Sequence, residues 1–248
     1  MEQKQKLLYF FFALFCIGVG LYPLAYLSSG FREQGVLDSK SQKLLMSNAY
    51  LAAFYLHISS GALALLTGWS QFLKSWRNKH LRFHRYLGYL YVTSVFTSSI
   101  AGFIIALFST GGTIGAVGFG ILAVLWFITN LLAVANIKKG KVKEHEKWMI
   151  RNYGLTFSAV TLRIYLPILL MIGLDIAQGL QIVAFLCWIP NIMATEAYIQ
   201  RKYVKSGIQC STKIKVINGW IWMRLTRAYL DDKEDKRFLY WQVFEFLL

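Results

Sequence analysis

Residues 144–167, EHEKWMIRNYGLTFSAVTLRIYLP, decide the fold of this chain. The stretch begins with charged residues and His145, and continues as an apolar segment of membrane length that contains Arg163. An arginine at such a depth costs about 3 kcal/mol on insertion scales, so it is retained where groups inside a helix bundle interact with it. At helical spacing, one stripe of the segment consists of Asn152, Thr156, Ala159, Arg163 and Pro167. The stretch therefore predicts a transmembrane helix with one polar, inward-looking face.

The composition is that of a membrane protein. Of the 248 residues, 56% are hydrophobic and only 16% are charged, whereas a soluble domain has about 25% charged residues. This excludes an ordinary cytosolic enzyme. The net charge of +15 does not indicate nucleic-acid binding, because the basic residues flank apolar segments. The three cysteines have no metal or redox spacing, and no nucleotide-binding or hydrolase motif is present, so no catalytic residue is predicted and enzymatic activity stays an open question.

Six apolar segments approach the roughly 20 residues that a bilayer requires. They cover residues 7–27, 48–73, 86–108, 114–137, 149–174 and 177–198. No signal-peptide cleavage site follows the first segment, which is therefore expected to be an uncleaved helix. The predicted fold is an all-α, polytopic membrane bundle of about six transmembrane helices. Its predicted parts are a first helix and periplasmic loop (1–47), a five-helix core (48–198) and a tail (199–248).

Lysine and arginine predict the orientation of the bundle. One side receives the basic residues of both termini and of the loops around 74–85 and 138–151, whereas the other side receives only Arg32, Lys40 and Lys43. Basic loops stay in the cytoplasm, so both termini are predicted to be cytoplasmic. The basic, aromatic tail is expected to form interfacial helices on the inner leaflet, where anionic lipids are its predicted partners.

Two consecutive segments carry small-residue faces that are expected to pack against each other. One face consists of His57, Gly61, Ala64, Gly68 and Gln71. The other consists of His84, Gly88, Tyr91, Val95, Ser98 and Gly102.

Depth along the helices predicts two polar layers. His57 and Arg163 fall in the outer half of the bundle. The inner layer, at the cytoplasmic boundary, contains His80, His84 and His145 with Gln71, Arg151 and Glu196. The alternative for His57 is a neutral core histidine bonded to Tyr or Ser. The inner histidines are alternatively residues that face phospholipid phosphates, and Glu196 alternatively extends to the interface. Ionisable groups within a membrane are a functional hypothesis by default.

Three motifs occur in order: HISSGALALLTGWSQF, HRYLGYLYV and the opening stretch, followed by WIPNIMATE. With them, residues 48–198 resemble the bacterial predicted membrane proteins of domain-of-unknown-function family 2306. The resemblance implies a bacterial inner-membrane location and gives no reaction. It singles out His57, Gly61, Gln71, His84, Arg85, Gly88, His145, Trp148, Arg151, Arg163 and Glu196. His80 is not part of that pattern.

Four functions are compatible with these residues. The leading hypothesis is a cytochrome b-like electron-transfer protein in which His84 and His145 bind one b-type haem and Arg151 neutralises a propionate. The second is a small-solute or proton-coupled transporter that uses His57 and Arg163. The third is a zinc site of a membrane hydrolase, with His80, His84, His145 and Glu196 as ligands. The last is a structural or assembly factor. The haem and zinc hypotheses share the prediction that His84 and His145 approach each other.

Overall fold

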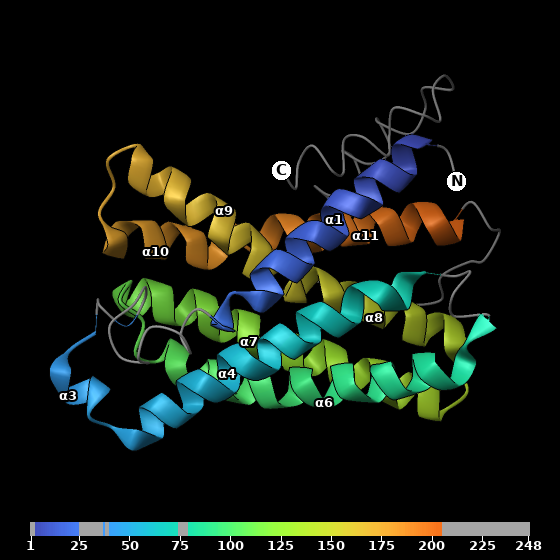
Figure 1. Ribbon diagram of the computed structural model, residues 1–248, viewed down its shortest axis with the longest axis horizontal. Coiled ribbons are helices and arrows are strands. Elements are labelled where there is room, and N and C mark those ends of the chain that lie inside the picture. Colours follow the sequence, from blue (N-terminus) through green and yellow to red (C-terminus); the bar gives the residue numbers. More distant parts are fainter. Residues whose placement is uncertain (1–2, 25–36, 38–39, 74–78, 205–248) are drawn as a thin grey trace, which may run out of the picture. The chain divides into compact units, whose positions relative to one another are not determined.

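The computed structural model describes residues 3–24, 37, 40–73 and 79–204, and this part of the chain contains helices and no strand (Figure 1). The all-α prediction is confirmed. The helices are α1 (Gln3–Leu21), α3 (Gln42–Leu45), α4 (Asn48–Gly68) with the 3-10 turn η2 (Trp69–Phe72), α6 (Leu81–Ala106), α7 (Gly112–Lys138), α8 (Val142–Thr156), α9 (Ser158–Met171), α10 (Ile176–Leu186) and α11 (Ile189–Val204).

Five helical segments of the described chain are long and apolar enough to cross a membrane. They are Asn48–Phe72, Leu81–Ala106, Gly112–Lys138, Val142–Met171 and Ile176–Tyr203. A sixth apolar helix, α1, is shorter, and its apolar part is Tyr9–Leu21. Each predicted segment therefore overlaps one of these apolar helical segments, and the protein is a multi-pass membrane bundle. The cytoplasmic location of the termini stays a prediction.

The chain forms two compact units, Met1–Thr195 and Glu196–Leu248. The first unit contains α1 to α10 and the beginning of α11. Of the second unit, the structure describes residues 196–204, which continue α11 beyond the predicted boundary at 198. The predicted interfacial helices of the tail fall on residues 205–248, outside the described residues.

Helix α6 packs between α4 and α7, and α7 in turn packs against α8 (Figure 1). The α6–α7 pair is antiparallel, because Asn130 donates its side-chain amide to Val92 O (3.0 Å) while Phe96 contacts Phe127. The pairing of the two small-residue faces on α4 and α6 is confirmed. Gly88 departs from that prediction, because a Cβ at this position would meet nothing within 4 Å.

The predicted helix at residues 149–174 is interrupted at Phe157, where α8 ends and α9 begins (Figure 1). Threonine hydroxyls compete for backbone carbonyls on both sides of this residue. Thr156 Oγ1 donates to Asn152 O (3.0 Å), and Thr161 Oγ1 lies 3.5 Å from Phe157 O and 3.3 Å from Ser158 O. Such side-chain bonding to the preceding turn bends helices. The ring of Phe12 on α1 stacks on Phe157 with centroids 5.2 Å apart, so α1 packs directly on the break.

A second interruption separates α10 from α11. Pro190 stands in the first turn of α11 and has no amide hydrogen for the preceding turn, which explains why the helix does not continue. The carbonyl of Cys187 at this break accepts from Asn191 Nδ2 at 3.0 Å. The same amide group lies 3.2 Å from Gly154 O on α8. Asn191 thus joins the two broken segments.

A buried polar cluster fills the space between α6, α7 and α8. Tyr91 Oη donates to Asn152 Oδ1 (2.5 Å) and lies 2.8 Å from Thr156 Oγ1. The amide of Asn152 donates to Trp126 O and to Thr129 Oγ1, both at 2.8 Å. In a bilayer core no water satisfies such groups, so their mutual bonds hold the three helices in one register.

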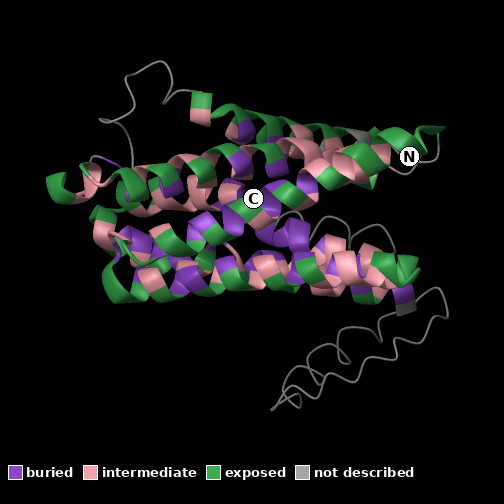
Figure 2. Cartoon of the chain, turned by 90° about the horizontal axis from the view of Figure 1, so that it is seen from below, coloured by how far each residue is buried: buried purple, intermediate pink, exposed green. Residues whose placement is uncertain are grey.

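Apolar side chains cover the outward faces of the helices. Figure 2 shows buried residues on the inward sides and exposed residues on the outward sides of the ribbons. Exposed large side chains include Leu56 (53%), Ile100 (56%) and Ile114 (54%). An apolar surface of this extent is what lipid chains require of a membrane protein.

Candidate functional site

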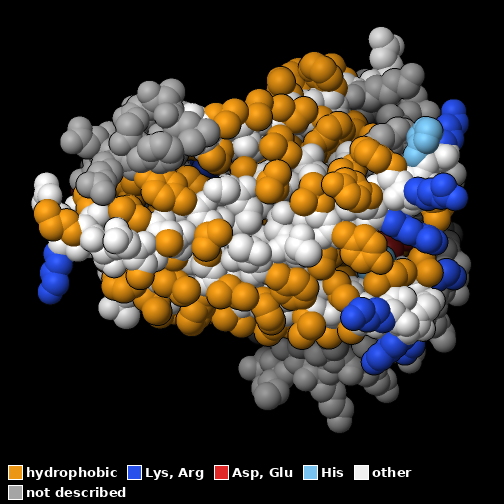
Figure 3. Space-filling model, turned by 60° about the horizontal axis from the view of Figure 1, so that its bottom comes forward, with side chains coloured by type: hydrophobic (Ala, Val, Ile, Leu, Met, Phe, Trp, Pro, Cys, Tyr) orange, Lys and Arg blue, Asp and Glu red, His pale blue; other side chains and the backbone are white. Residues whose placement is uncertain are grey.

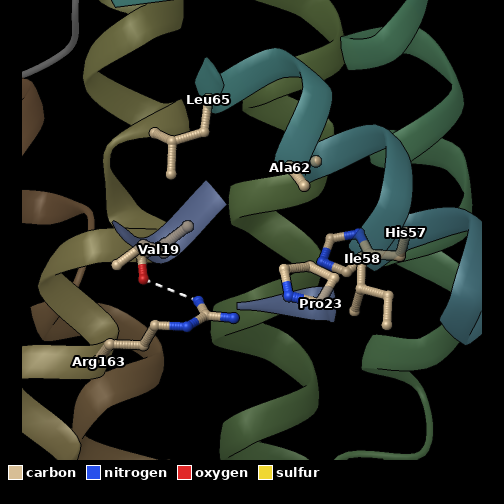
Figure 4. Close-up of a pocket in the computed structure, with 9 residues that line it drawn as sticks. Val19, Pro23, His57, Ile58, Ala62, Leu65 and Arg163 are labelled. Atoms are coloured by element: carbon tan, nitrogen blue, oxygen red, sulfur yellow. Dashed lines mark hydrogen bonds between the residues drawn. The ribbon is translucent and has the colours of Figure 1, made fainter. Parts of the chain in front are cut away.

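A pocket of about 70 Å³ lies where α1, α4 and α9 meet (Figure 4). Its described lining consists of Val19, Pro23, His57, Ile58, Gly61, Ala62, Leu65, Ala159 and Arg163. His57 and Arg163, which were predicted for one outer layer, are the two polar side chains of this lining. The pocket therefore combines a cation and an imidazole in otherwise apolar surroundings.

The ring of His57 is fixed by α6. His57 Nδ1 lies 2.9 Å from the carbonyl oxygen of Ser98, which can only accept, so Nδ1 carries a proton. Ser98 Oγ donates to His57 O (2.9 Å), which completes a reciprocal pair. The imidazole packs over Gly102, where an added Cβ would come within 2.8 Å of Nδ1. Because Nδ1 carries the proton, Nε2 of the neutral ring is an acceptor.

Arg163 is held by its own helix and by the end of α1. Its Nη1 donates to Ala159 O at 2.9 Å, the bond drawn in Figure 4. Its Cζ lies 4.9 Å from the centroid of the Tyr22 ring, a cation–π distance. The predicted stripe is thus divided by the break at Phe157. Asn152 and Thr156 enter the polar cluster, whereas Ala159 and Arg163 reach the pocket.

Sequence reasoning missed the contribution of α1 to the pocket. Val19, Tyr22 and Pro23 were assigned to a first helix outside the core, yet Val19 and Pro23 line the pocket and Tyr22 contacts Arg163. The segment is apolar apart from Tyr9, Tyr22 and Tyr26, and it carried no signal that distinguished this role.

At the other end of the bundle, His145 lies in the first turn of α8. Its Nδ1 lies 2.8 Å from Ala133 O on α7, so this nitrogen carries the proton. His84 lies half-buried in the first turn of α6. Helices α6 and α8 are parallel, and Tyr91 bonds to Asn152 between them. Both histidines precede these bonded residues by seven positions, about two helical turns, so they lie at one level.

The remaining inner-layer residues of the first unit lie on different elements of the chain. His80 is exposed just before α6. Arg151 Cζ lies 4.6 Å from the ring centroid of Trp148 on the same helix. Gln71 lies in η2, and both polar atoms of its side chain are buried with no hydrogen-bond partner among the described residues. Glu196 begins the second compact unit.

No group of three or more His, Cys, Asp or Glu side chains in the described part of the chain is arranged to hold a metal ion. The pocket, rather than the inner layer, is therefore the better-defined candidate site. Lys147, at the same end of the bundle, was not predicted as a buried residue. It is 2% exposed, and its ammonium group bonds to the carboxylate of Glu144 at 2.7 Å.

A comparison with known families agrees with this architecture. Residues 54–199, more than half of the chain, match the family described as Predicted membrane protein (DUF2306). The chain belongs to this family. No curated protein and no solved structure matches it. The DUF2306 match covers α6 to α10 and most of α4, including His57, Arg163, His84 and His145. Helix α1 with Val19, and Pro23 just after this helix, precede the matched residues.

Proposed function

We propose that this DUF2306 protein binds the anionic group of a small solute in the His57–Arg163 pocket and moves it in step with a proton. The observation that carries this proposal is the convergence of these two side chains in one small pocket. Membrane proteins retain ionisable groups at such positions mainly for substrates, ions or protons.

The chemistry of the pocket favours a compact anion. A water molecule occupies about 30 Å³ in the liquid, so a pocket of about 70 Å³ has room for a group of carboxylate size. The guanidinium of Arg163 keeps its charge at physiological pH and offers several donors in one plane, a geometry that suits carboxylate oxygens. The apolar remainder of the lining strengthens this attraction by excluding water.

His57 supplies the proton-linked element. In the neutral ring, Nε2 is an acceptor that a bound anion would leave unsatisfied, whereas the protonated ring is a donor with a positive charge. Arg163 is the other charged group of the described lining, and Tyr22 is the titratable residue beside it. An anion next to both side chains favours proton uptake by His57, and by reciprocity proton uptake favours anion binding.

Thermal unfolding of the purified protein in detergent, with acetate, propionate or phosphate titrated against chloride, tests the binding step. A bound anion at concentration c raises the free energy of unfolding by RT ln(1 + c/Kd), so the midpoint rises with the logarithm of the anion concentration once this exceeds the Kd. We expect one carboxylate or phosphate probe to stabilise the protein, and the stabilisation to grow as the pH is lowered, because a protonated His57 adds a positive charge beside the bound anion. Proteoliposome uptake of the stabilising anion, with and without an inward proton gradient, then tests movement.

Arg163→Gln should abolish the stabilisation by the anion, and His57→Gln should abolish its pH dependence. Lys43→Gln is the control, since it removes an exposed cation that does not line the pocket. An unmodified protein that no probe stabilises more than chloride does would contradict the proposal. Binding without uptake would limit the function to a receptor or binding protein.

The second candidate is the haem hypothesis, which the register of α6 and α8 favours. His84 and His145 lie at one level, and the bond from His145 Nδ1 to Ala133 O leaves Nε2 as the nitrogen that an iron would take. Bound b-type haem would supply one-electron transfer. A reduced-minus-oxidised absorption spectrum of protein expressed with haem supply tests this hypothesis. An α-band that is lost in both His84→Ala and His145→Ala would support it. Absence of a Soret band from the unmodified protein would contradict it.

A further inference from the structure

Cationic side chains gather at the inner end of α6, α7 and α8. The described residues of this group are Lys79, Arg82, Arg85, Lys138, Lys139, Lys141 and Lys143, and all are exposed. Figure 3 shows lysine and arginine side chains collected mainly at one end of the visible face, next to a wide apolar surface. We call these seven residues the basic rim.

The packing of α6 against α7 brings the two parts of the basic rim together, the part at the start of α6 and the part at the end of α7. These helices are antiparallel, and the Asn130 amide bonds to Val92 O. Moving seven residues from that bond, about two turns, toward the N-terminus of α6 and the C-terminus of α7 leads to Arg85 and to Ile137, next to Lys138. Two arginines at the start of α6 therefore lie at the level of the lysines that end α7.

The basic rim is not neutralised by the described part of the chain. The ion pair found there joins Lys147 to Glu144, outside the rim, and no rim residue forms a side-chain hydrogen bond with a described residue. Like charges this close together repel one another, so an anionic partner stabilises them.

Exposed aromatic residues follow the rim on the same helix. Phe83, Tyr86 and Tyr89 of α6 are 44%, 67% and 74% exposed. Aromatic rings of this kind lie at the headgroup level of a bilayer, where one end of the ring is apolar and the other polar. They therefore place the basic rim beside lipid headgroups rather than in bulk water.

We infer that the basic rim binds the phosphates of anionic phospholipids in the leaflet around it. Basic residues next to a membrane segment attract anionic headgroups, and arginine additionally donates to two phosphate oxygens at once. Charge alone also determines topology, but a purely topological role requires no preference among the lipids that surround the folded protein.

Native mass spectrometry of the detergent-solubilised full chain separates these two roles. The protein is mixed with equal amounts of phosphatidylglycerol and phosphatidylcholine, and the bound lipids are counted. We expect bound phosphatidylglycerol to exceed phosphatidylcholine, and the excess to shrink when the mixture is incubated at high ionic strength before desalting. Equal counts of the two lipids for the unmodified protein would overturn the inference without any variant.

The variant Arg82→Gln/Arg85→Gln/Lys138→Gln/Lys139→Gln should lose most of the phosphatidylglycerol excess. Arg82→Lys/Arg85→Lys keeps the charge and should retain most of it, whereas Lys43→Gln removes an exposed cation near the opposite end and should retain all of it. If the variant with four substitutions folds and keeps its excess of bound phosphatidylglycerol, the inference is overturned. If that variant fails to fold, Arg82→Gln/Arg85→Gln decides instead. A loss of about half of the excess supports the inference, because the contributions of single surface cations are similar, whereas an unchanged excess overturns it.

Discussion

Asn152 on α8 accepts a hydrogen bond of 2.5 Å from Tyr91 on α6, and its amide donates to two groups of α7 at 2.8 Å. One buried asparagine thereby joins three helices, α6, α7 and α8. The bond also determines which residues of α6 and α8 share a level, so the geometry of the inner layer depends on it. Asn152 was predicted as part of an inward polar stripe, and its 0% exposure agrees.

Asn152→Ala should lower the free energy of unfolding by about 1–3 kcal/mol, because it leaves the buried hydroxyl of Tyr91 and a carbonyl of α7 with fewer partners. Reversible unfolding in mixed micelles measures the change. Tyr89→Phe removes a hydroxyl from a tyrosine that is 74% exposed and is the control. A loss no larger than that of the control would show that the cluster contributes little to stability.

Gly68→Ala should destabilise the bundle, since the new Cβ would come within 2.3 Å of Tyr153 Cε2 and 2.7 Å of Tyr91 Cε2. Overpacking of this kind costs about 1–3 kcal/mol where neighbouring rings cannot move away. Gly88→Ala is the matched control, because nothing lies within 4 Å of its added Cβ. Thermal midpoints of the two variants in the same detergent provide the comparison, and equal midpoints would contradict close packing at Gly68.

Gly102→Ala should weaken the pocket rather than the whole bundle. Its Cβ would lie 2.8 Å from His57 Nδ1, which forces the imidazole away from Ser98 O. We expect the anion stabilisation proposed above to fall at least as far as in His57→Gln. Gly120→Ala is the control, because its nearest neighbour would be at an ordinary 3.8 Å. Unchanged anion binding in Gly102→Ala would show that the position of His57 does not matter to the site.

The helices could be predicted from the sequence because apolar length alone identifies a membrane segment. The meeting of His57 and Arg163 could be predicted because depth follows from residue count along straight helices. The break at Phe157 could not, since threonine residues bend a helix only where their hydroxyls find particular carbonyls. Asn191 is a further example, because its partners Gly154 and Cys187 become neighbours only after both helices break.

The role of α1 was beyond sequence reasoning for a different reason. An apolar helix in a bilayer has no hydrophobic periodicity that distinguishes its packed face from its lipid face, because both are apolar. Val19 and Pro23 therefore carried no sign that they line the pocket. The glycine faces of α4 and α6 were predictable, since small residues have a direct packing consequence there.

The stability of the protein should rise with pH in the alkaline range through Lys40. Burial lowers the pKa of this ammonium group below its ordinary value of 10.5, and its Nζ donates to Phe108 O near the start of α7. Between the lowered and the ordinary pKa the unfolded chain binds more protons than the folded chain, so stability increases with pH in that window. Below both values the cost of burying the charge is present in full.

Lys40→Met should remove this increase, and Lys43→Met, which replaces an exposed lysine, should keep it. Unfolding free energies from neutral pH up to 10.5 measure both slopes. Parallel curves for Lys40→Met and the unmodified protein would show that Lys40 is not the group responsible.

The predicted orientation can be tested at the two ends of α7. Lys141 lies exposed in the turn after this helix, and Thr113 lies exposed in its first turn. Cys16 and Cys187 are 0% exposed, so the maleimide should label them little. Cys210, which lies outside the described residues, is replaced by serine to remove the third native thiol. Because the basic loop is expected to stay inside, a membrane-impermeant maleimide should label Thr113→Cys in intact bacterial cells. It should label Lys141→Cys only after the cells are permeabilised. The reverse pattern would place both termini outside and move the pocket, with His57 and Arg163, to the cytoplasmic half of the bundle.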